Sequence, residues 1–316
     1  MSKRRFAVIG SGALGGLYGA MLARAGFEVH FLLHSDADHV REHGLQIDSK
    51  NGDFHLNDVL VYDDASKMPA CDVTILGLKT THNHLLPELL PAAAGRDGVV
   101  LVLQNGLDVE ADTAAVVGPD RVLGGCCFLC SNKVGPGHIH HLDYGRILFG
   151  RYSPADQPPV GVDEPLQALA ADLKSAGIDA QATGDLWRAR WRKLMWNIPF
   201  NGLSVVLDAA TDQLMNNAAA TRLAREIMQE VAAGSAACGR PQPEDAIETT
   251  MEHTRNMVPY DSSMRLDYKA GRPMELQAIL GNPIAAAERA GAAMPKAQML
   301  LDQLRFLEQR PSGRSR

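Results

Sequence analysis

Short apolar segments alternate with helical patterns over the first half of the chain. The segments predicted to be strands lie at residues 6–9, 28–33, 73–78, 99–103 and 121–126. Because parallel strands are joined through helices, this alternation predicts βαβ units and a parallel sheet. Residues 44–60 alternate in polarity around Asn51-Gly52 and predict a small antiparallel hairpin. Residues 138–149 predict another hairpin, with its turn at 143–145.

A glycine-rich turn separates the first apolar segment from a helix-like stretch at residues 17–25. Its residues are Gly10, Ser11, Gly12, Ala13, Leu14 and Gly15. In a dinucleotide-binding turn, the first glycine permits the tight bend, the second lets backbone approach a pyrophosphate, and the third lets helix and strand pack. The helix N-terminus adds amide donors. We therefore predict a coenzyme site here; the alternative is a glycine turn that serves packing alone.

The pattern changes after Gly184 to long helical segments with almost no strand signal. Predicted helices cover residues 185–208, 212–238, 243–257, 262–269, 275–290 and 295–307. Asp212 is the expected N-cap of the second, and Gly239 follows its end. We predict an α/β fold with an N-terminal Rossmann-type doubly wound sheet, residues 1–183, and an all-helical C-terminal domain, residues 184–316. The polar residues 309–316 are expected to be disordered.

Composition narrows the classes of partner. The 316 residues suit two domains of about 150 residues each. With 31 basic and 37 acidic residues, the net charge of −6 offers no general attraction for nucleic acid. Residues 3–23 imitate a secretory signal, but their glycines match the nucleotide turn, and no apolar run approaches the ~20 residues of a membrane span. We expect a cytoplasmic protein without nucleic-acid or membrane partners.

The five cysteines are expected to be reduced thiols, since they are odd in number and lack the spacing of a disulfide framework. Cys127 and Cys130 have CxxC spacing, and His138, His140 and His141 follow, so a zinc site is one interpretation. The favoured interpretation is a buried strand over residues 122–129, in which cysteine acts as a small hydrophobic residue. We predict no metal.

The segment 186–203 contains all three tryptophans and a stripe of polar residues. Lys193, Asn197 and Asn201 are spaced four apart, so at ~100° per residue they drift by only about 80° around a helix. A buried amide or ammonium left unpaired costs roughly 1–3 kcal/mol, so we predict that this stripe binds a ligand. The alternative is a solvated stripe on a surface helix. Pro199 is expected to kink the helix.

Two further polar residues follow predicted strands. Lys79 comes after residues 73–78, and Asn105 follows residues 99–103. Ligands of open α/β sheets lie outside the carboxyl ends of the strands, so both residues are placed to contact coenzyme or substrate. The alternatives are a lysine that extends to water and an ordinary Asn-Gly turn.

Together these residues resemble the ketopantoate reductase (2-dehydropantoate 2-reductase) family. The resemblance spans nearly the whole chain and is carried by the glycine turn, Lys79, Asn105-Gly106, Trp187-Arg188, Arg192-Lys193-Leu194, Asn197, Asn201, Ser262-Ser263-Met264, Asp267 and Glu275. It implies an oxidoreductase of pantothenate and coenzyme A biosynthesis, in which NADPH delivers a hydride to the ketone of ketopantoate and gives pantoate.

The resemblance also implies roles for single residues. Lys193 is the general acid, because an ammonium stabilises charge on the ketone oxygen and donates a proton. Glu275 is the second catalytic residue, with an ordinary acid at a helix N-terminus as the alternative. The residues implied for the substrate are Asn197, Asn201, Ser263 and Asn105. Those implied for the coenzyme are Gly10, Ser11, Gly12, Ala13, Leu14, Gly15, His34, Lys79 and Asn105.

Two departures from the family pattern bear on specificity. His34 stands where many members have an arginine that grips the adenosine phosphate, and Asp36 is close to the place of an NAD-binding acid. We expect NADPH, with NADH as the alternative. Thr211 stands where some members have a substrate-contacting asparagine, which leaves another 2-keto acid open as substrate. A non-catalytic NADP-binding sensor is the remaining hypothesis, and a homodimer is left open.

Overall fold

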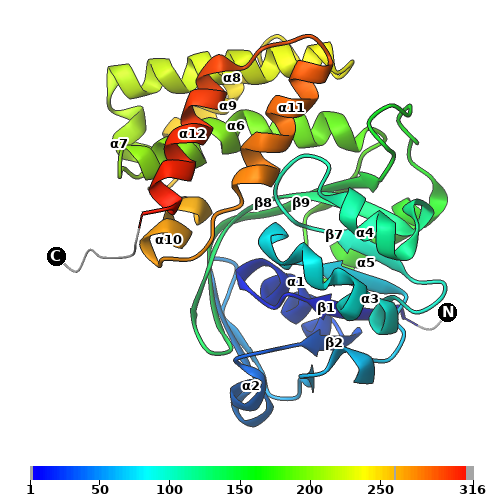
Figure 1. Cartoon of the computed structure of the whole chain (residues 1–316). Coiled ribbons are helices and arrows are strands. Elements are labelled where there is room, and N and C mark those ends of the chain that lie inside the picture. The colour runs from blue at the N-terminus through cyan, green and yellow to red at the C-terminus, as the bar shows by residue number, and fades with distance from the viewer. Residues whose placement is uncertain (1–2, 260, 311–316) are drawn as a thin grey trace. The chain divides into compact units, whose positions relative to one another are not determined.

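The computed structural model describes residues 3–259 and 261–310 (Figure 1). The chain forms two compact units. The first consists of Met1–Gln104 and Val109–Leu186, and the second of Asn105–Asp108 and Trp187–Arg316. A short segment of the N-terminal half therefore belongs to the helical unit. Within the described ranges, no helix combines the length and the hydropathy that crossing a bilayer requires.

The first unit is built on one mixed sheet. Its strands are β1 (Arg5–Ile9), β2 (Glu28–Leu32), β3 (Leu45–Ser49), β4 (Phe54–Leu56), β5 (Leu60–Tyr62), β6 (Val73–Leu76), β7 (Val99–Val102), β8 (Val122–Gly135), β9 (His138–Arg151) and β10 (Ala180–Ala182). Their order is β4-β3-β9-β8-β7-β6-β1-β2-β5, and β10 pairs with β9. The strands from β8 to β5 along this order pair in parallel, as predicted.

Helices cover both faces of the parallel part. They are α1 (Ala13–Arg24), α2 (Ala37–His43), α3 (Leu86–Ala94), α4 (Glu110–Val117) and α5 (Glu164–Ser175), with short 3-10 turns η1 (Ala65–Lys67), η2 (Thr80–Leu85) and η3 (Pro119–Arg121). All four residues from Phe6 to Ile9 are fully buried, although their side chains alternate between the two faces. Phe6 and Val8 pack in one core cluster with Leu17 of α1 and Leu169 of α5. The predicted Rossmann-type fold is confirmed.

The sheet departs from the prediction at β8 and β9. The hairpin predicted over residues 138–149 is wrong, because β9 is a single strand that pairs antiparallel with β8. Tyr144 and Gly145 have φ values of 61° and 127°, and the register shifts nearby. The turn-like residues thus form an irregularity inside a strand, and the sheet is mixed rather than parallel. The hairpin at Asn51-Gly52 is confirmed by the antiparallel pairing of β3 with β4.

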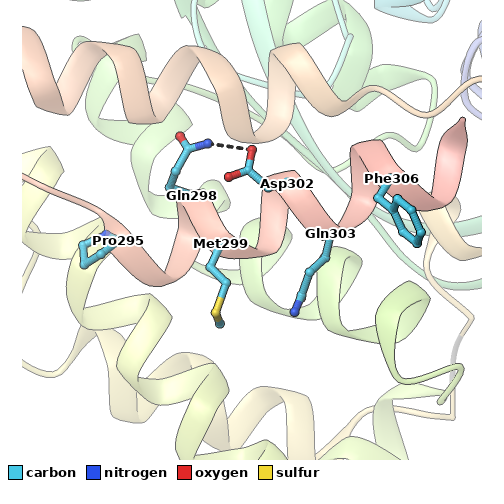
Figure 2. A pocket seen from close by; sticks show the side chains of 6 residues that line it. All are labelled: Pro295, Gln298, Met299, Asp302, Gln303 and Phe306. Atoms are coloured by element: carbon cyan, nitrogen blue, oxygen red, sulfur yellow. Dashed lines mark hydrogen bonds between the residues drawn. The ribbon is translucent and has the colours of Figure 1, made fainter.

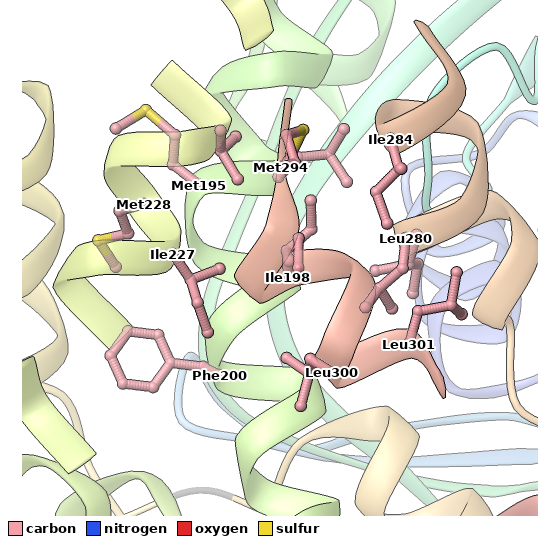
Figure 3. Close-up of a cluster of buried hydrophobic side chains, with 14 of the residues drawn as sticks. Met195, Ile198, Phe200, Ile227, Met228, Leu280, Ile284, Met294, Leu300 and Leu301 are labelled. Carbon is pink, nitrogen blue, oxygen red and sulfur yellow. The ribbon is translucent and has the colours of Figure 1, made fainter. Parts of the chain in front are cut away.

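In the second unit, helices form the described part of the chain after Trp187, apart from the loops that connect them, and run from green to red in Figure 1. They are α6 (Leu186–Val206), α7 (Thr211–Met215), α8 (Ala218–Ala237), α9 (Ala246–Asn256), α10 (Ser263–Lys269), the π-helical turn η4 (Gln277–Gly281), α11 (Asn282–Arg289) and α12 (Pro295–Glu308). Their core combines residues of α6, α8, α11 and α12, which converge in Figure 3 around Ile198, Ile227 and Leu300.

Two of the predicted helices are interrupted. The single helix predicted over residues 212–238 is wrong, because α7 ends at Met215 and α8 starts anew after Asn217. The Asn217 side chain accepts hydrogen bonds from the amides of Ala219 and Ala220, both at 3.0 Å, which is the geometry of an N-cap. The helix predicted over residues 275–290 contains the π-helical turn η4. Of the tail predicted to be disordered, residues 311–316 lie outside the described residues.

Candidate active site

Close backbone contacts shape the glycine turn between β1 and α1. Gly10 has a φ of +91°, and a Cβ there would lie 2.3 Å from the Leu78 amide nitrogen. A Cβ at Gly15 would lie 2.3 Å from the Gly10 carbonyl oxygen, and one at Gly77 would lie 2.9 Å from the same atom. Sequence analysis missed Gly77, whose signal is its position directly after a buried strand. Larger side chains at these positions would collide with backbone.

Gly12 leaves open space at the N-terminus of α1. A Cβ at Gly12 would meet no atom within 4 Å. Among the described residues no side chain caps this helix, and its first turn has no acidic residue. Helix N-termini attract anions through their amides and the helix dipole. The turn, including Ser11, Ala13 and Leu14, therefore fits the pyrophosphate of a dinucleotide coenzyme.

The loops after β6 and β7 are tied together by Gln104. Its Nε2 donates to the Leu78 carbonyl oxygen at 2.9 Å and to Asn83 Oδ1 at 2.7 Å. Lys79, which was predicted to contact the coenzyme, lies between Leu78 and Asn83 in the sequence. It is half-buried and directly precedes η2. Sequence analysis did not select Gln104, although it directly precedes Asn105. Gln104 fixes the loop that carries Lys79.

The loop after β2 contains His34, which is exposed. The hydroxyl of Ser11 donates to the Leu32 carbonyl oxygen at 3.3 Å, so the glycine turn is joined to the end of β2. His34 therefore follows a strand end that contacts the predicted coenzyme turn. This position agrees with the coenzyme role expected for His34, which remains a prediction.

Asp36 is buried in the same loop and has three partners. Lys133 Nζ lies 2.5 Å from Oδ2, and the Gly137 amide donates to the same oxygen at 2.9 Å. The Ser35 hydroxyl donates to Oδ1 at 2.9 Å. Burial alone would raise the pKa of the Asp36 carboxyl, but the hydrogen bonds from Lys133, Gly137 and Ser35 outweigh it and lower the pKa. Asp36 is thus a carboxylate engaged by the turn between β8 and β9.

Helix α6 carries the predicted polar stripe. It runs without interruption from Leu186 to Val206 and includes Pro199. Lys193 is half-buried, and its Nζ donates to Asn105 Oδ1 at 2.5 Å. Two residues that sequence analysis selected separately, 88 positions apart, are therefore in direct contact. The stripe is not the solvated surface that was the alternative.

Asn197 and Asn201 are buried on the same helix, with 5% and 2% of their surface exposed. Within residues 3–259 and 261–310, neither side-chain amide has a hydrogen-bond partner. Amides with so little exposure are nearly always hydrogen-bonded to protein, water or a ligand. A polar ligand on this side of α6 would satisfy both side chains. This is the strongest sign of a substrate site in the second unit.

The segment Asn105–Asp108 is held on η4. The Leu107 amide donates to the Ala278 carbonyl oxygen at 3.0 Å, and Asn282 Nδ2 donates to the Leu107 carbonyl oxygen at 2.8 Å. Gly106 has a φ of +125°, and a Cβ there would lie 2.5 Å from the Ala278 oxygen. These contacts fix the backbone beside Asn105, whose amide meets Lys193.

Pro283 explains why Ala278 can accept that bond. In a π-helical turn a carbonyl bonds to the amide five residues later, as Gln277 does with Asn282. For Ala278 the fifth residue is Pro283, which has no N–H. The Ala278 oxygen is therefore left for the Leu107 amide. A proline in the chain thus creates the docking point for the Asn105 segment.

Glu275 and Ser263 occupy different environments. Glu275 is buried, with 9% of its surface exposed, two residues before η4. Ser263 is exposed as the first residue of α10, whereas Ser262 is the N-cap and accepts from the Arg265 amide at 3.2 Å. Ser262 Oγ also lies 2.7 Å from Ser204 Oγ, which donates to the Asn201 carbonyl oxygen. Sequence analysis gave no role to Ser262 and did not select Ser204, although these two residues connect α10 to the helix that carries the stripe.

The cysteines of β8 sit in a buried strand, as the favoured interpretation expected. Cys126, Cys127 and Cys130 are buried, and burial raises the pKa of Cys130 to about 12. In the ranges that the structure covers, no group of three or more His, Cys, Asp or Glu side chains is arranged to hold a metal ion. The described cysteines are thiols that take part in no disulfide.

A surface depression along α12 is separate from these residues. It is lined by Pro295, Gln298, Met299, Asp302, Gln303 and Phe306, and Figure 2 shows the bond from Gln298 to Asp302. None of the predicted site residues lines it. It is open to solvent and mainly apolar, and its charged group is the single carboxylate of Asp302. We do not assign the candidate site to this depression.

A Rossmann-type unit with an anion-binding glycine turn, together with a helical unit that holds a lysine among buried amides, defines an NAD(P)H-dependent oxidoreductase. The family model "Ketopantoate reductase PanE/ApbA" matches residues 6–154. The model "Ketopantoate reductase PanE/ApbA C terminal" matches residues 185–308. The chain belongs to the ketopantoate reductase family, which confirms the resemblance found in the sequence.

Individual relatives agree with this assignment. The 2-dehydropantoate 2-reductase of Nostoc sp. is 49% identical over 310 residues, covering 98% of this chain and 97% of that protein. The crystal structure of 2-dehydropantoate 2-reductase from Geobacter metallireducens has a TM-score of 0.90 at 40% identity and covers 96% and 99% of the two chains. D-mandelate dehydrogenase, in a ternary structure with NADH and anilino(oxo)acetate, shares the fold at 22% identity and a TM-score of 0.86, covering 96% and 98%.

Proposed function

We propose that this protein is an NADPH-dependent 2-dehydropantoate 2-reductase, which reduces the ketone of ketopantoate to the hydroxyl of pantoate. The observation that carries the proposal is the arrangement on α6. Lys193 is held by Asn105, and the next two turns present the buried, unpartnered amides of Asn197 and Asn201. A small 2-keto acid offers a ketone for the ammonium and carboxylate and hydroxyl oxygens for the amides.

The coenzyme would be held by the first unit. The amides at the N-terminus of α1 and the open space at Gly12 suit its pyrophosphate, and His34 and Lys79 follow the ends of β2 and β6. Asp36 is engaged by Lys133, which argues against a ribose-binding acid and supports NADPH over NADH. When bound, the nicotinamide supplies the hydride.

Lys193 carries the proton chemistry. As hydride reaches the ketone carbon, negative charge develops on the oxygen, and an ammonium beside it stabilises the charge and transfers one proton. The products are an alcohol and a neutral lysine, which regains its proton from water. Asn105 holds the ammonium in place through its Oδ1. The buried Glu275 carboxyl is assigned to orient the substrate hydroxyl or Lys193 by a charge-assisted hydrogen bond.

Oxidation of NADPH, followed by absorbance with and without ketopantoate, tests this proposal. We expect ketopantoate-dependent turnover, and Lys193→Met should lower kcat by roughly 10²- to 10⁴-fold, the range for loss of a general acid. NADPH binding should be unchanged in this variant. Lys174→Met, on the exposed surface of α5, is the matched control and should keep wild-type kcat. Turnover that survives Lys193→Met would refute the mechanism.

A second candidate is a reductase of the same family for another 2-keto acid. Thr211 favours it, because this buried residue is shorter than the asparagine expected from the family pattern. Hydrogen-bonded selection among small substrates is sensitive to such a change. A panel of 2-keto acids, compared by kcat/KM, separates the two candidates: a higher kcat/KM for another acid than for ketopantoate would replace the first assignment.

A further inference from the structure

The loop after β2 is where Rossmann-type folds distinguish the two nicotinamide coenzymes. An acidic residue about 20 positions after the glycine turn accepts the ribose hydroxyls of NAD, whereas NADP carries a 2′-phosphate that a carboxylate repels. Asp36 lies about 20 positions after Gly15. By sequence alone this chain therefore has the acid of an NAD enzyme.

In the structure, the end of β8 lies beside the loop after β2. The Ser131 hydroxyl lies 3.5 Å from the carbonyl oxygen of Ala13, the first residue of α1. Alternate residues of a strand share a face, so Lys133 lies on the same face of β8 as Ser131. The Ser11 hydroxyl joins the glycine turn to Leu32 at the end of β2. Lys133 thus approaches the loop after β2 beside the glycine turn.

Lys133 and Asp36 form a pair with unequal exposure. The Asp36 side chain is 8% exposed and the Lys133 side chain 33%, with 2.5 Å between Nζ and Oδ2. The same oxygen accepts from the Gly137 amide, and Oδ1 accepts from Ser35. The charge of the buried carboxylate is therefore balanced by Lys133, while the lysine side chain keeps contact with solvent.

We propose that Lys133 sets coenzyme selectivity by engaging the Asp36 carboxylate, so that an acid in the position typical of NAD enzymes does not exclude a 2′-phosphate. This inference rests on the proposed NADPH-dependent function and names the residues that determine its coenzyme preference. Asp36 and Lys133 act as positioning residues: the lysine removes the net negative charge that would face the phosphate. No residue of the glycine turn takes part.

Three variants separate the charge from the fold. Lys133→Met keeps the length of the side chain but leaves the Asp36 carboxylate without its cation. The double variant Lys133→Met/Asp36→Asn removes both charges. The amide oxygen that it introduces can accept from the Gly137 amide, and the amide NH₂ can donate to the Ser35 hydroxyl. Lys50→Met is the control. Lys50 directly follows β3, and it also pairs with an aspartate, Asp143 of β9. Thermal unfolding by circular dichroism reports whether each variant is folded.

Calorimetric binding of adenosine 2′,5′-bisphosphate and of 5′-AMP measures selectivity without turnover. In the wild type we expect the bisphosphate to bind more tightly. Lys133→Met should reduce the ratio of the two affinities by roughly tenfold, since a repulsive charge near the phosphate is worth about 1–2 kcal/mol. The double variant should recover most of the wild-type ratio. Lys50→Met should keep it.

Each other outcome overturns the inference. An unchanged ratio in folded Lys133→Met would mean that Asp36 does not influence the 2′-phosphate. A reduced ratio that the double variant fails to restore would mean that Lys133 contacts the phosphate itself. Binding of NADPH to the wild type is measured in parallel, because its absence would refute the proposed function rather than the role of Lys133.

Discussion

The glycine turn of the first unit and helix α6 of the second unit are built from different chemical groups. At the glycine turn the surface is backbone: Gly10 and Gly15 leave no room for a side chain, and Gly12 faces open space. On α6 the site depends on side chains that are present and buried, Asn197 and Asn201. Substitutions in the glycine turn should therefore disturb shape, and substitutions on α6 should disturb hydrogen bonding.

The largest effects are expected within the glycine turn, where two neighbouring glycines should behave differently. Gly15→Ala places a Cβ 2.3 Å from the Gly10 oxygen, so we expect the free energy of unfolding to fall by about 3 kcal/mol. Gly12→Ala meets no atom within 4 Å and has a φ of −74°, so it should fold normally. Its methyl group should nevertheless weaken NADPH binding by roughly tenfold, since it occupies the approach to the helix N-terminus.

Urea unfolding and calorimetric titration with NADPH measure both quantities. Wild-type affinity in Gly12→Ala would show that the pyrophosphate does not use this space. Wild-type stability in Gly15→Ala would show that the turn relaxes without cost.

On α6, a variant should lose activity without losing stability. Asn201→Leu replaces an unpartnered buried amide by an apolar group of similar shape, so the free energy of unfolding should stay level or rise. The kcat/KM for ketopantoate should fall by roughly 10- to 100-fold, because hydrogen bonds to the substrate are lost. Ser204→Ala is the contrast: its hydroxyl has two partners, at 2.9 and 2.7 Å, so its loss should cost about 1 kcal/mol of stability.

Unfolding curves and steady-state kinetics on the same preparations decide this prediction. Marked destabilisation by Asn201→Leu would mean that the amide supports the helix itself. In that case the assignment of Asn201 to the substrate would lose its basis.

The smallest effect lies outside both regions, at the break between α7 and α8. Asn217→Ala removes the side chain that accepts from the amides of Ala219 and Ala220, and it should lower the free energy of unfolding by about 1 kcal/mol. Asn217→Gly should cost only a few tenths of a kcal/mol, since glycine is tolerated at an N-cap. Turnover should not change in either variant. Equal losses in the two variants would contradict the capping role.

Sequence prediction succeeded where the pattern is local. The glycine pattern predicted the turn between β1 and α1, and the four-residue spacing of Lys193, Asn197 and Asn201 predicted their shared position on α6. Their contacts with coenzyme and substrate remain predictions. Residues that are compatible with more than one local structure misled the prediction. Tyr144-Gly145 has the composition of a turn but forms an irregularity inside a long strand. Asn217 caps a new helix inside a stretch that looked like one continuous helix.

Contacts between distant positions could not be predicted. The bond from Lys193 to Asn105 and the pair of Lys133 with Asp36 depend on how the strands and helices pack, which no local pattern records. Sequence analysis treated Asp36 as an acid near the ribose position. The structure changes this interpretation: Asp36 is buried and paired with Lys133, and a carboxylate paired with an ammonium carries little net charge as a pair.

The carbonyl that Pro283 leaves to Leu107 has a consequence for dissecting the protein. The helical unit is discontinuous in sequence, since Asn105–Asp108 belongs to it. A fragment cut at the second family match, residues 185–308, would carry Lys193 but lack Asn105, and the Ala278 oxygen would lose its donor. Separately expressed halves should therefore be inactive even when each is folded, and activity would require that the halves reassociate.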